Sequence, residues 1–350
     1  MKPTWIRTLT LTLALLLCLP LVACGNTADK IATTTAQDQP TEQTVAELDK
    51  ELKIDIMVLS GTTGVGIAPM INDVKNGTAA LNYNIEVASS ADMINPGLIQ
   101  GEVEIAALPT NVASVLYNKT GGKVLVAAVN TKGVLYLLEN GETVKSFADL
   151  KGKTVYLPGQ GSNPEYIFRY LVEKNGLVIG QDVMIDYTYG SPDELATAIT
   201  SGLVSLAVLP EPKVTAIKSQ NAAVRSALDF TAEWNKVSPA DSQLVQGCIV
   251  VQKSFAEEHP AELAQFLKDY EASINFVNTN IDEAATMIEA AGIIPKAPLA
   301  KKALPSCNIC FMTGEEMKAS MNSFFKVLFD MAPTSIGGAL PDDGIYYLPQ

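Results

Sequence analysis

The sequence contains an internal repeat with a spacing of about one hundred residues. Segments 90–109 and 191–210 align without a gap, and each reads Ser, Asp, a helical stretch, Gly, a short apolar strand and Leu-Pro. Upstream, segments 53–59 and 153–157 are both apolar strands that run into a glycine-rich loop. This spacing is too long for a solenoid repeat. It predicts two similar halves within one protein.

Each half has the predicted order strand, loop, helix, strand, loop, helix, strand. The first helix of each half is expected to end at Asn-Gly, at 76–77 and 175–176, because glycine readily terminates helices. The second strands are predicted at 83–87 and 183–187. Parallel strands joined by helices form an α/β sheet. The sequence therefore predicts an α/β protein with two lobes.

Two segments are predicted to connect these lobes. Segment 123–138 has two apolar runs around Asn130-Thr131-Lys132-Gly133, and segment 243–251 is a further strand-like run. A pair of crossings between lobes forms a hinge. The helical periodicity after residue 254 predicts helices that cover the first lobe. The predicted domains are lobe 1 from 53–130 with 250–350, and lobe 2 from 131–249.

The N-terminus has the pattern of an export signal. Lys2 and Arg7 precede a nearly apolar stretch, 9–23, which is too short to span a bilayer comfortably. This stretch ends at Leu-Val-Ala-Cys, which resembles a bacterial lipobox, so residues 1–23 are interpreted as a lipoprotein signal peptide and Cys24 as the lipidation site. A lipid there would anchor the protein to the outer face of the cell membrane or in the periplasm. A plain secretory signal with a chance cysteine is the alternative.

Residues 24–52 are predicted to be a disordered tether, because the segment is rich in Thr, Gln, Ala and Asp and has no apolar period. The formal net charge of -13 argues against nucleic acid as a partner, since no basic stretch could neutralise phosphates. We expect a monomer whose partners are a small solute and a membrane protein.

Three cysteines follow the signal: Cys248, Cys307 and Cys310. The last two have C-x-x-C spacing, and in a strand they would face opposite ways, so a disulfide would require a turn. Buried free thiols are favoured over a redox pair. A metal site is not expected, because His259 is the only histidine and lies apart from the cysteines in sequence.

Several stretches together resemble the bacterial substrate-binding proteins of the nitrate, sulfonate, taurine and thiamine-pyrimidine type. The resemblance implies a periplasmic binding protein type II fold, in which two lobes joined by a two-segment hinge close over a solute. It also implies delivery of that solute to the permease of an ABC importer. The stretches are the lipobox at Cys24, and segments 61–64, 106–111, 149–153, 159–161, 209–212, 246–247 and 335–338.

The loops at the carboxyl ends of the predicted strands are the candidate ligand site, since ligands of open α/β sheets bind there. Small polar residues at helix starts favour anions or polar oxygens, because free N–H groups and the helix dipole point toward them. Ser, Thr and Asn that merely cap their helices are the alternative. The predicted ligand contacts are Thr62, Thr63, Gly64, Ser90, Thr110, Asn111, Asn130, Gln160, Gly161, Ser162, Asn163, Tyr189 and Glu211.

Arginine is scarce in the mature sequence. Arg169 and Arg225, both in predicted helices, are the only two after the signal, so no bidentate clamp for phosphate is expected at a loop tip. This leaves neutral polar heterocycles, amides, or a sulfonate held by helix ends. Glu211 could pair with a cationic ligand or equally bond a helix start, and Tyr189 could stack on a ring.

We expect no enzyme activity, no cofactor and no metal. The sequence has no Ser-His-Asp order, no H-E-x-x-H motif and no Walker loop. Two alternatives remain: a ligand sensor that signals to a membrane partner, and a pyrimidine-synthase-like enzyme on the same fold.

Overall fold

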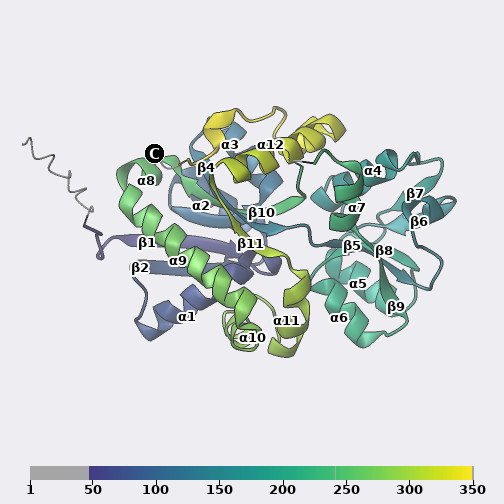
Figure 1. Ribbon diagram of the computed structural model, residues 1–350, viewed down its shortest axis with the longest axis horizontal. Helices are drawn as coiled ribbons and strands as arrows, with labels where there is room; N and C mark the ends of the chain where they lie inside the picture. The colour runs from purple at the N-terminus through teal and green to yellow at the C-terminus, as the bar shows by residue number, and fades with distance from the viewer. Residues whose placement is uncertain (1–46, 241, 349–350) are drawn as a thin grey trace, which may run out of the picture. The chain divides into compact units, whose positions relative to one another are not determined.

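A computed structural model describes residues 47–240 and 242–348 (Figure 1). The predicted signal peptide, Cys24 and most of the predicted tether lie outside these residues. Among the described residues, no helix has the length and apolar character needed to cross a membrane. By their mutual contacts, the described residues belong to one compact unit.

The strands form two sheets. The six-stranded sheet has the order β11-β4-β10-β3-β1-β2, and the five-stranded sheet has the order β7-β6-β8-β5-β9. The strands are β1 Lys53–Leu59, β2 Asn82–Ala88, β3 Ile105–Pro109, β4 Val124–Lys132, β5 Leu135–Asn140, β6 Lys153–Tyr156, β7 Val183–Asp186, β8 Leu206–Pro210, β9 Val224–Asp229, β10 Val245–Gln252 and β11 Ile309–Met312.

The helices connect the strands and flank the sheets. They are α1 Ala68–Asn76, α2 Ala91–Gln100, α3 Thr110–Thr120, α4 Asn163–Lys174, α5 Pro192–Thr200, α6 Lys213–Gln220, α7 Phe230–Val237, α8 Lys253–Glu258, α9 Pro260–Thr279, α10 Ile281–Ala290, α11 Ala297–Ala303 and α12 Gly314–Met331. Short 3-10 helices are η1 Thr62–Ile67, η2 Phe147–Leu150, η3 Leu304–Ser306, η4 Pro333–Ile336 and η5 Asp343–Ile345. Figure 1 shows α9 crossing in front of the six-stranded sheet.

Strand direction places the polar loops of each sheet at one edge. In the first sheet β1 is parallel to β2 and β3, and β10 is antiparallel to both β3 and β4. In the second sheet β6 is parallel to β7 and β8, and β5 is antiparallel to both β8 and β9. Strands β1 to β4 therefore end at one edge of their sheet, and β6 to β9 end at one edge of theirs.

The chain crosses between the sheets at two places. Strand β4 ends at Lys132 and β5 begins at Leu135, so the first crossing is two residues long. The second crossing follows α7 and enters β10 at Val245, which pairs with Lys132. Leu135 pairs with Pro210 at the end of β8. Both crossings therefore lie at the carboxyl edges of both sheets.

The sheet membership of β10 differs from the predicted division of the chain. Residues 245–249 were assigned to the second lobe, but they belong to the six-stranded sheet. The paired hydrogen bonds of β10 with β3 and β4 explain this, because the strand is already within the sheet at its first residue.

The predicted repeat matches the observed elements. Strands β1 and β6 begin at the predicted residues, and helix α1 ends at Asn76 with Gly77 in the left-handed conformation (φ 70°). The first copy differs in the turn η1, which precedes α1. At Gly64 a Cβ atom would lie 2.0 Å from the Leu59 carbonyl oxygen, so the backbone folds directly onto the end of β1.

The C-terminal helices cover more than the first sheet. Helix α12 packs against β4 and β10, but also against α4, and α11 packs against α6. The Phe324 ring lies 5.7 Å from the Trp234 ring, which joins α12 to α7. The tail was predicted to cover the first lobe, and α11 and α12 in addition contact α6 and α4, because the periodicity of a helix does not tell which partners its apolar face meets.

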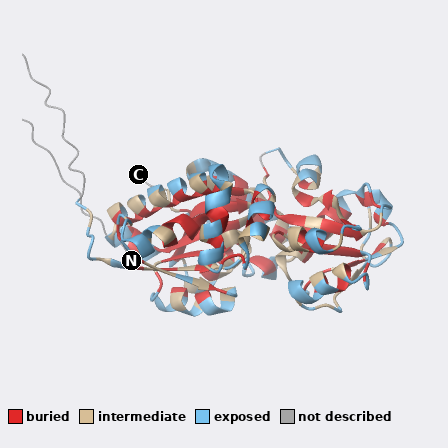
Figure 2. Cartoon of the chain, turned by 90° about the horizontal axis from the view of Figure 1, so that it is seen from below, coloured by how far each residue is buried: buried red, intermediate tan, exposed pale blue. Residues whose placement is uncertain are grey.

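The hydrophobic core runs through both sheets. Figure 2 shows the buried strands enclosed by helices whose outer faces are exposed. One apolar cluster includes Leu108 and Val129 of the first sheet together with Leu137 and Phe230 near the second. Fully buried aromatic side chains contribute strongly to such a core, since each removes a large apolar area from water.

Candidate ligand-binding site

The loop after β1 presents two hydroxyl groups. Thr62 and Thr63 are half-buried, and their side chains form no hydrogen bond within the described part of the chain. Gly61 has φ 85°, a left-handed conformation that favours glycine, and it leads directly into η1. The loop therefore keeps both hydroxyls available for another molecule.

Asn130 holds this loop from the neighbouring strand β4. Its Nδ2 donates to the Thr63 carbonyl oxygen and to the Tyr270 hydroxyl, both at 2.9 Å. Its Oδ1 accepts a hydrogen bond from the Thr131 hydroxyl at 3.0 Å. The side chain is 1% exposed, so its observed role is to position the loop. The predicted contact between Asn130 and a ligand stays a prediction.

The loops after β2 and β3 differ in accessibility. Ser90 is exposed at the start of α2, and its side chain makes no cap hydrogen bond. Thr110 is fully buried and its hydroxyl donates to the Val245 carbonyl oxygen at 2.9 Å. Asn111 is half-buried, and its buried Oδ1 has no hydrogen-bond partner within the described residues. Ser90 and Asn111 thus have capacity for a ligand, whereas the Thr110 hydroxyl is already bonded.

The loop after β6 has the same position in the second half of the repeat. Gly159 and Gly161 have φ angles of 77° and 75°, and Gln160 between them is exposed. The Ser162 hydroxyl donates to the Gly159 carbonyl oxygen at 2.9 Å and does not cap α4. Asn163 begins α4, and its buried Oδ1 has no partner among the described residues. This loop is therefore also an uncapped helix start.

Glu165 fixes the shape of this second loop. Its carboxylate accepts hydrogen bonds from the Gly161 N–H at 2.5 Å, the Tyr187 hydroxyl at 2.5 Å and Arg169 Nε at 2.7 Å. Burial alone would raise the pKa of Glu165. The hydrogen bonds from Tyr187, Gly161 and Arg169 outweigh burial and lower that pKa below its ordinary value.

Tyr189 and Glu211 lie in the two following loops. The half-buried Tyr189 ring packs against Tyr156, with ring centroids 5.9 Å apart. Glu211 is 4% exposed, and its carboxylate accepts hydrogen bonds from the Thr215 hydroxyl at 2.9 Å and the Thr215 N–H at 3.1 Å. Burial raises the pKa of Glu211. The structure therefore gives Glu211 the predicted helix-start role, and contact with a ligand stays a prediction.

The helix starts at these edges fall into two classes. At α5, α6 and α7 a side chain accepts hydrogen bonds from N–H groups of the first turn. The acceptors are Ser191, in a capping box with Glu194, at α5, Glu211 at α6 and Asp229 at α7. At η1, α2, α3 and α4 no side chain of the described residues accepts a hydrogen bond from an N–H group of the first turn. The N-cap serines of α2 and α4, Ser90 and Ser162, therefore do not cap their helices by a side-chain hydrogen bond.

Two residues with available polar groups were not predicted. Lys132 ends β4, is half-buried and forms no ion pair within the described residues. Thr231 is the second residue of α7 and lies beside the first crossing, and its buried hydroxyl oxygen has no partner within the described residues. A charged residue at the end of an otherwise apolar run was the signal for Lys132. The signal for Thr231 was its position in the first turn of the helix that follows β9.

Both arginines are bound to carboxylates. Arg169 pairs with Glu165 at 2.7 Å, and Arg225 pairs with Glu139 at 2.5 Å. Arg225 also donates to the carbonyl oxygens of Gly141 and Val144. Arg225 lies in β9, so its prediction as a helical residue was wrong, since pairing of β9 with β5 decides the local structure.

The three cysteines of the described residues are free thiols. Cys248 and Cys307 are buried, and burial raises the pKa of both groups. Asn308 provides the turn between Cys307 and Cys310, with φ 47°. Within the described part of the chain, no cluster of three or more His, Cys, Asp or Glu side chains is arranged to hold a metal ion.

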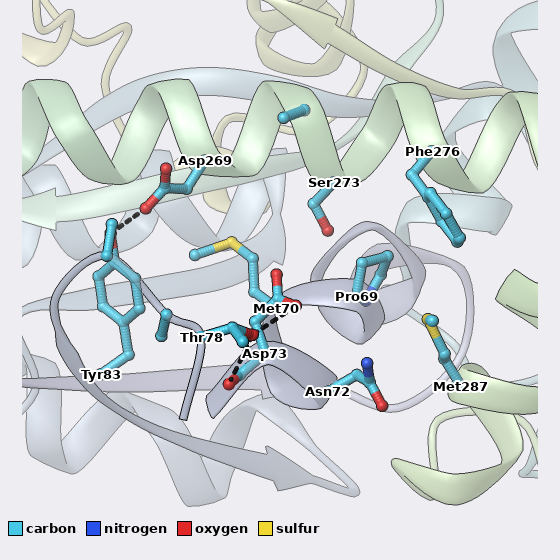
Figure 3. Close-up of a pocket in the computed structure, with 13 residues that line it drawn as sticks. Pro69, Met70, Asn72, Asp73, Thr78, Tyr83, Asp269, Ser273, Phe276 and Met287 are labelled. Carbon is cyan, nitrogen blue, oxygen red and sulfur yellow. Dashed lines mark hydrogen bonds between the residues drawn. The ribbon is translucent and has the colours of Figure 1, made fainter. Parts of the chain in front are cut away.

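A separate pocket of about 290 Å³ lies between α1, β2, α9 and α10 (Figure 3). The Tyr83 hydroxyl donates to Asp269 at 2.8 Å along one side, and Phe276 and Met287 line another. None of the predicted site residues lines it. This pocket is therefore distinct from the strand-end loops.

The sequence matches a family model described as the ABC transporter phosphonate periplasmic substrate-binding protein, over residues 64–301. The chain belongs to this family. It is accordingly the solute-binding subunit of an ABC importer, and its relatives are binding proteins without enzymatic activity. No curated protein matches the sequence at a significant level.

Solved structures confirm the predicted periplasmic binding protein type II fold of this substrate-binding protein. An ABC transporter protein from Parabacteroides distasonis is 24% identical, with a TM-score of 0.72 and coverage of 86% of this chain and 100% of that chain. The periplasmic aliphatic sulphonate binding protein of Escherichia coli is 15% identical, with a TM-score of 0.67 and coverage of 85% and 92%. The alkanesulfonate-binding protein of Xanthomonas axonopodis pv. citri, bound to MOPS, is 13% identical, with a TM-score of 0.58 and coverage of 85% and 96%.

Proposed function

We propose that this substrate-binding protein captures a small organic oxyanion, a sulfonate or singly charged phosphonate, between two lobes. The observation that carries the proposal is the set of uncapped helix starts at η1, α2, α3 and α4. Free backbone N–H groups at a helix start attract anions. The carboxylates of Glu211, Glu194 and Asp229 occupy the other three starts, so an anion is directed away from them.

The charged groups favour a single negative charge on the ligand. Arg169 and Arg225 are already paired with carboxylates, so neither offers a free guanidinium clamp. Lys132 supplies one positive charge at the end of β4. The amides of Asn111 and Asn163 can turn to present either oxygen or nitrogen, and each has an unpaired buried atom.

Capture requires movement of the two lobes. Both sets of strand-end loops lie at sheet edges joined by the two short crossings. No hydrogen bond among the described residues joins loops 60–64 or 88–90 to loops 158–163 or 188–191. A ligand that bonds both sets would stabilise a closed arrangement and shift the population toward it. The permease would then receive the closed form.

The test is binding of methanesulfonate and methylphosphonate, measured by isothermal titration calorimetry. We expect Thr63→Val combined with Gln160→Ala to weaken binding at least tenfold, about 1.4 kcal/mol, because a hydroxyl and an amide contact are lost. The midpoint of thermal unfolding without ligand should stay nearly unchanged, since neither side chain has a bond to lose. Thr154→Val, at an exposed position of β6, is the matched control.

Two results would contradict the proposal. One is a large loss of stability without ligand, which would show that the two side chains support the fold. The other is tight binding of an organic amine with no response to either anion, which would assign the site to a cation near Glu211.

The proposal includes attachment to the outer face of the membrane through a lipid on Cys24, and action as a monomer. The lipobox-like order at residues 21–24 supports the lipid anchor. In expressing cells, Cys24→Ser should move the protein from the membrane fraction to the soluble fraction and abolish incorporation of labelled palmitate. Unchanged membrane association of this variant would rule the anchor out.

A further inference from the structure

The C-x-x-C turn contacts the first crossing between the sheets. Asn308 Nδ2 donates to the Gly133 carbonyl oxygen at 2.5 Å, and the Lys132 N–H donates to the Asn308 carbonyl oxygen at 3.1 Å. Asn308 is the one residue other than glycine with a positive φ, 47°, among the described residues. Such a conformation costs energy and is retained where neighbouring contacts enforce it.

The crossing itself has three bonded groups. The Gly133 carbonyl accepts from Asn308 of the first lobe, and the Val134 N–H donates to Gln246 Oε1 of β10 at 2.6 Å. The Val134 carbonyl accepts from the Glu211 N–H of the second lobe at 3.0 Å. Asn308 precedes β11 and Gln246 lies in β10, so the first two bonds hold the crossing to the first lobe, and the Glu211 bond holds it to the second lobe.

Gly133 has no room to adjust. A Cβ atom there would lie 2.2 Å from the Thr231 hydroxyl oxygen and 2.7 Å from Leu244 Cδ2. The two crossings and the start of α7 are thus packed together at this one residue. Asn308 therefore bonds the carbonyl of the residue at which the crossings are closely packed.

We infer that Asn308 is a positioning residue of the hinge, which holds the lobes in the present arrangement and so sets the apparent affinity for the solute. This inference rests on the proposed function, because affinity is its consequence. The loops of the two lobes share no hydrogen bond in this arrangement, whereas the Asn308 bond is formed. We assign this bond to the present, unclosed arrangement, so its loss is expected to favour closure. Asn308 lies in the turn between Cys307 and Cys310, and it is the residue of this segment that bonds the crossing.

The test compares Asn308→Asp and Asn308→Gly with the wild-type chain. Aspartate tolerates the left-handed conformation but cannot donate to Gly133, and glycine removes the side chain while keeping the backbone free. Asn278→Asp is the matched control, since Asn278 Nδ2 donates to the Ile309 carbonyl at 3.1 Å within the first lobe alone.

Two measurements are needed. Spin labels on cysteines at the exposed positions Glu102 and Glu142, in a Cys310→Ser background, report the distance between lobes without ligand. Calorimetry with methanesulfonate and methylphosphonate reports affinity. We expect both Asn308 variants to shift the label distances toward shorter values and to bind about fivefold more tightly. The Asn278 control should change neither quantity.

The inference is overturned if both quantities stay at wild-type values while thermal stability falls, which would make Asn308 a purely structural residue. Weaker binding by both variants would also overturn it, since the bond would then support the ligand-ready form. If neither anion binds the wild-type chain, the proposed function fails, and the label distances without ligand still decide the role of Asn308.

Discussion

The loops after β1 and β6 occupy the same place in the repeat but are held by different chemistry. The first is held by neutral contacts: Asn130 bonds the Thr63 carbonyl, and the Ser273 hydroxyl bonds the Gly66 carbonyl at 2.6 Å. The second is held by a buried carboxylate, Glu165, which bonds Gly161, Tyr187 and Arg169. Two similar halves can thus present similar loops while depending on different forces.

This difference predicts which changes each loop tolerates. Neutral amide and hydroxyl bonds with tight glycine packing respond strongly to added volume and weakly to pH. A buried, hydrogen-bonded carboxylate responds strongly to loss of its charge, because its partners are left unpaired. The first loop should therefore be sensitive to volume, and the second loop to charge and proton concentration.

Gly64→Ala should have the largest effect. The added Cβ would lie 2.0 Å from the Leu59 carbonyl oxygen, so the end of β1 or the start of η1 must move. We expect a loss of about 4 kcal/mol or more in the free energy of unfolding, measured by chemical denaturation. Gly159→Ala in the second loop should cost only about 1 kcal/mol, since its nearest neighbour would be 3.6 Å away and φ 77° is the main cost. Equal losses would remove the distinction between the loops.

Glu165→Gln should have the next largest effect. The amide has the same shape but carries no charge, and one of its two acceptor positions becomes a donor facing Arg169 or Gly161. We expect about 2–3 kcal/mol of lost stability at pH 7. Hydrogen exchange of backbone amides should rise in residues 159–163 and stay unchanged in residues 61–64. Increased exchange in both loops would show that they are not held independently.

The pH dependence follows from the lowered pKa of Glu165. A carboxyl group with a lower pKa in the folded state stabilises the fold fully above its ordinary value of 4.5, and this contribution is lost as pH falls through the lowered value. The stability difference between wild type and Glu165→Gln should thus be constant from pH 7 to about 5 and shrink at lower pH. A difference that grows on acidification would contradict the cause assigned to the shift.

Lys132→Gln should have the smallest of these effects. The lysine is half-buried at the end of β4 and forms no ion pair in the described residues, so its loss should weaken anion binding by about threefold to tenfold. The difference should decrease at high salt, because ions screen a partly exposed charge. Lys119→Gln, at an exposed site in α3, changes the charge equally and should leave affinity unchanged.

The order of the strands and helices could be predicted from the sequence, because the residues that begin or end each element lie within that element or next to it. The Asn-Gly at 76–77 ends α1 through the conformational freedom of glycine, and β1 spans the predicted residues 53–59. The candidate loops followed from strand direction alone. No such local signal exists for the partners of a side chain that lie far away in the chain.

Long-range partners account for what could not be predicted. Asn130 reads as a polar residue near a crossing, and its bond to Tyr270 spans 140 residues. Glu211 has the same sequence context whether it meets a ligand or caps α6. The packing of α12 against α4 and α7 as well as the first sheet includes the contact of Phe324 with Trp234, which helical periodicity cannot specify.

The most direct test of the account is backbone amide hydrogen exchange with and without saturating methanesulfonate or methylphosphonate. The account predicts that residues 61–64 of the first loop and residues 159–163 of the second gain protection together, because one anion bonds both uncapped helix starts. Protection of one loop alone, or protection confined to the pocket between α1 and α9, would contradict a shared site between the two sheets.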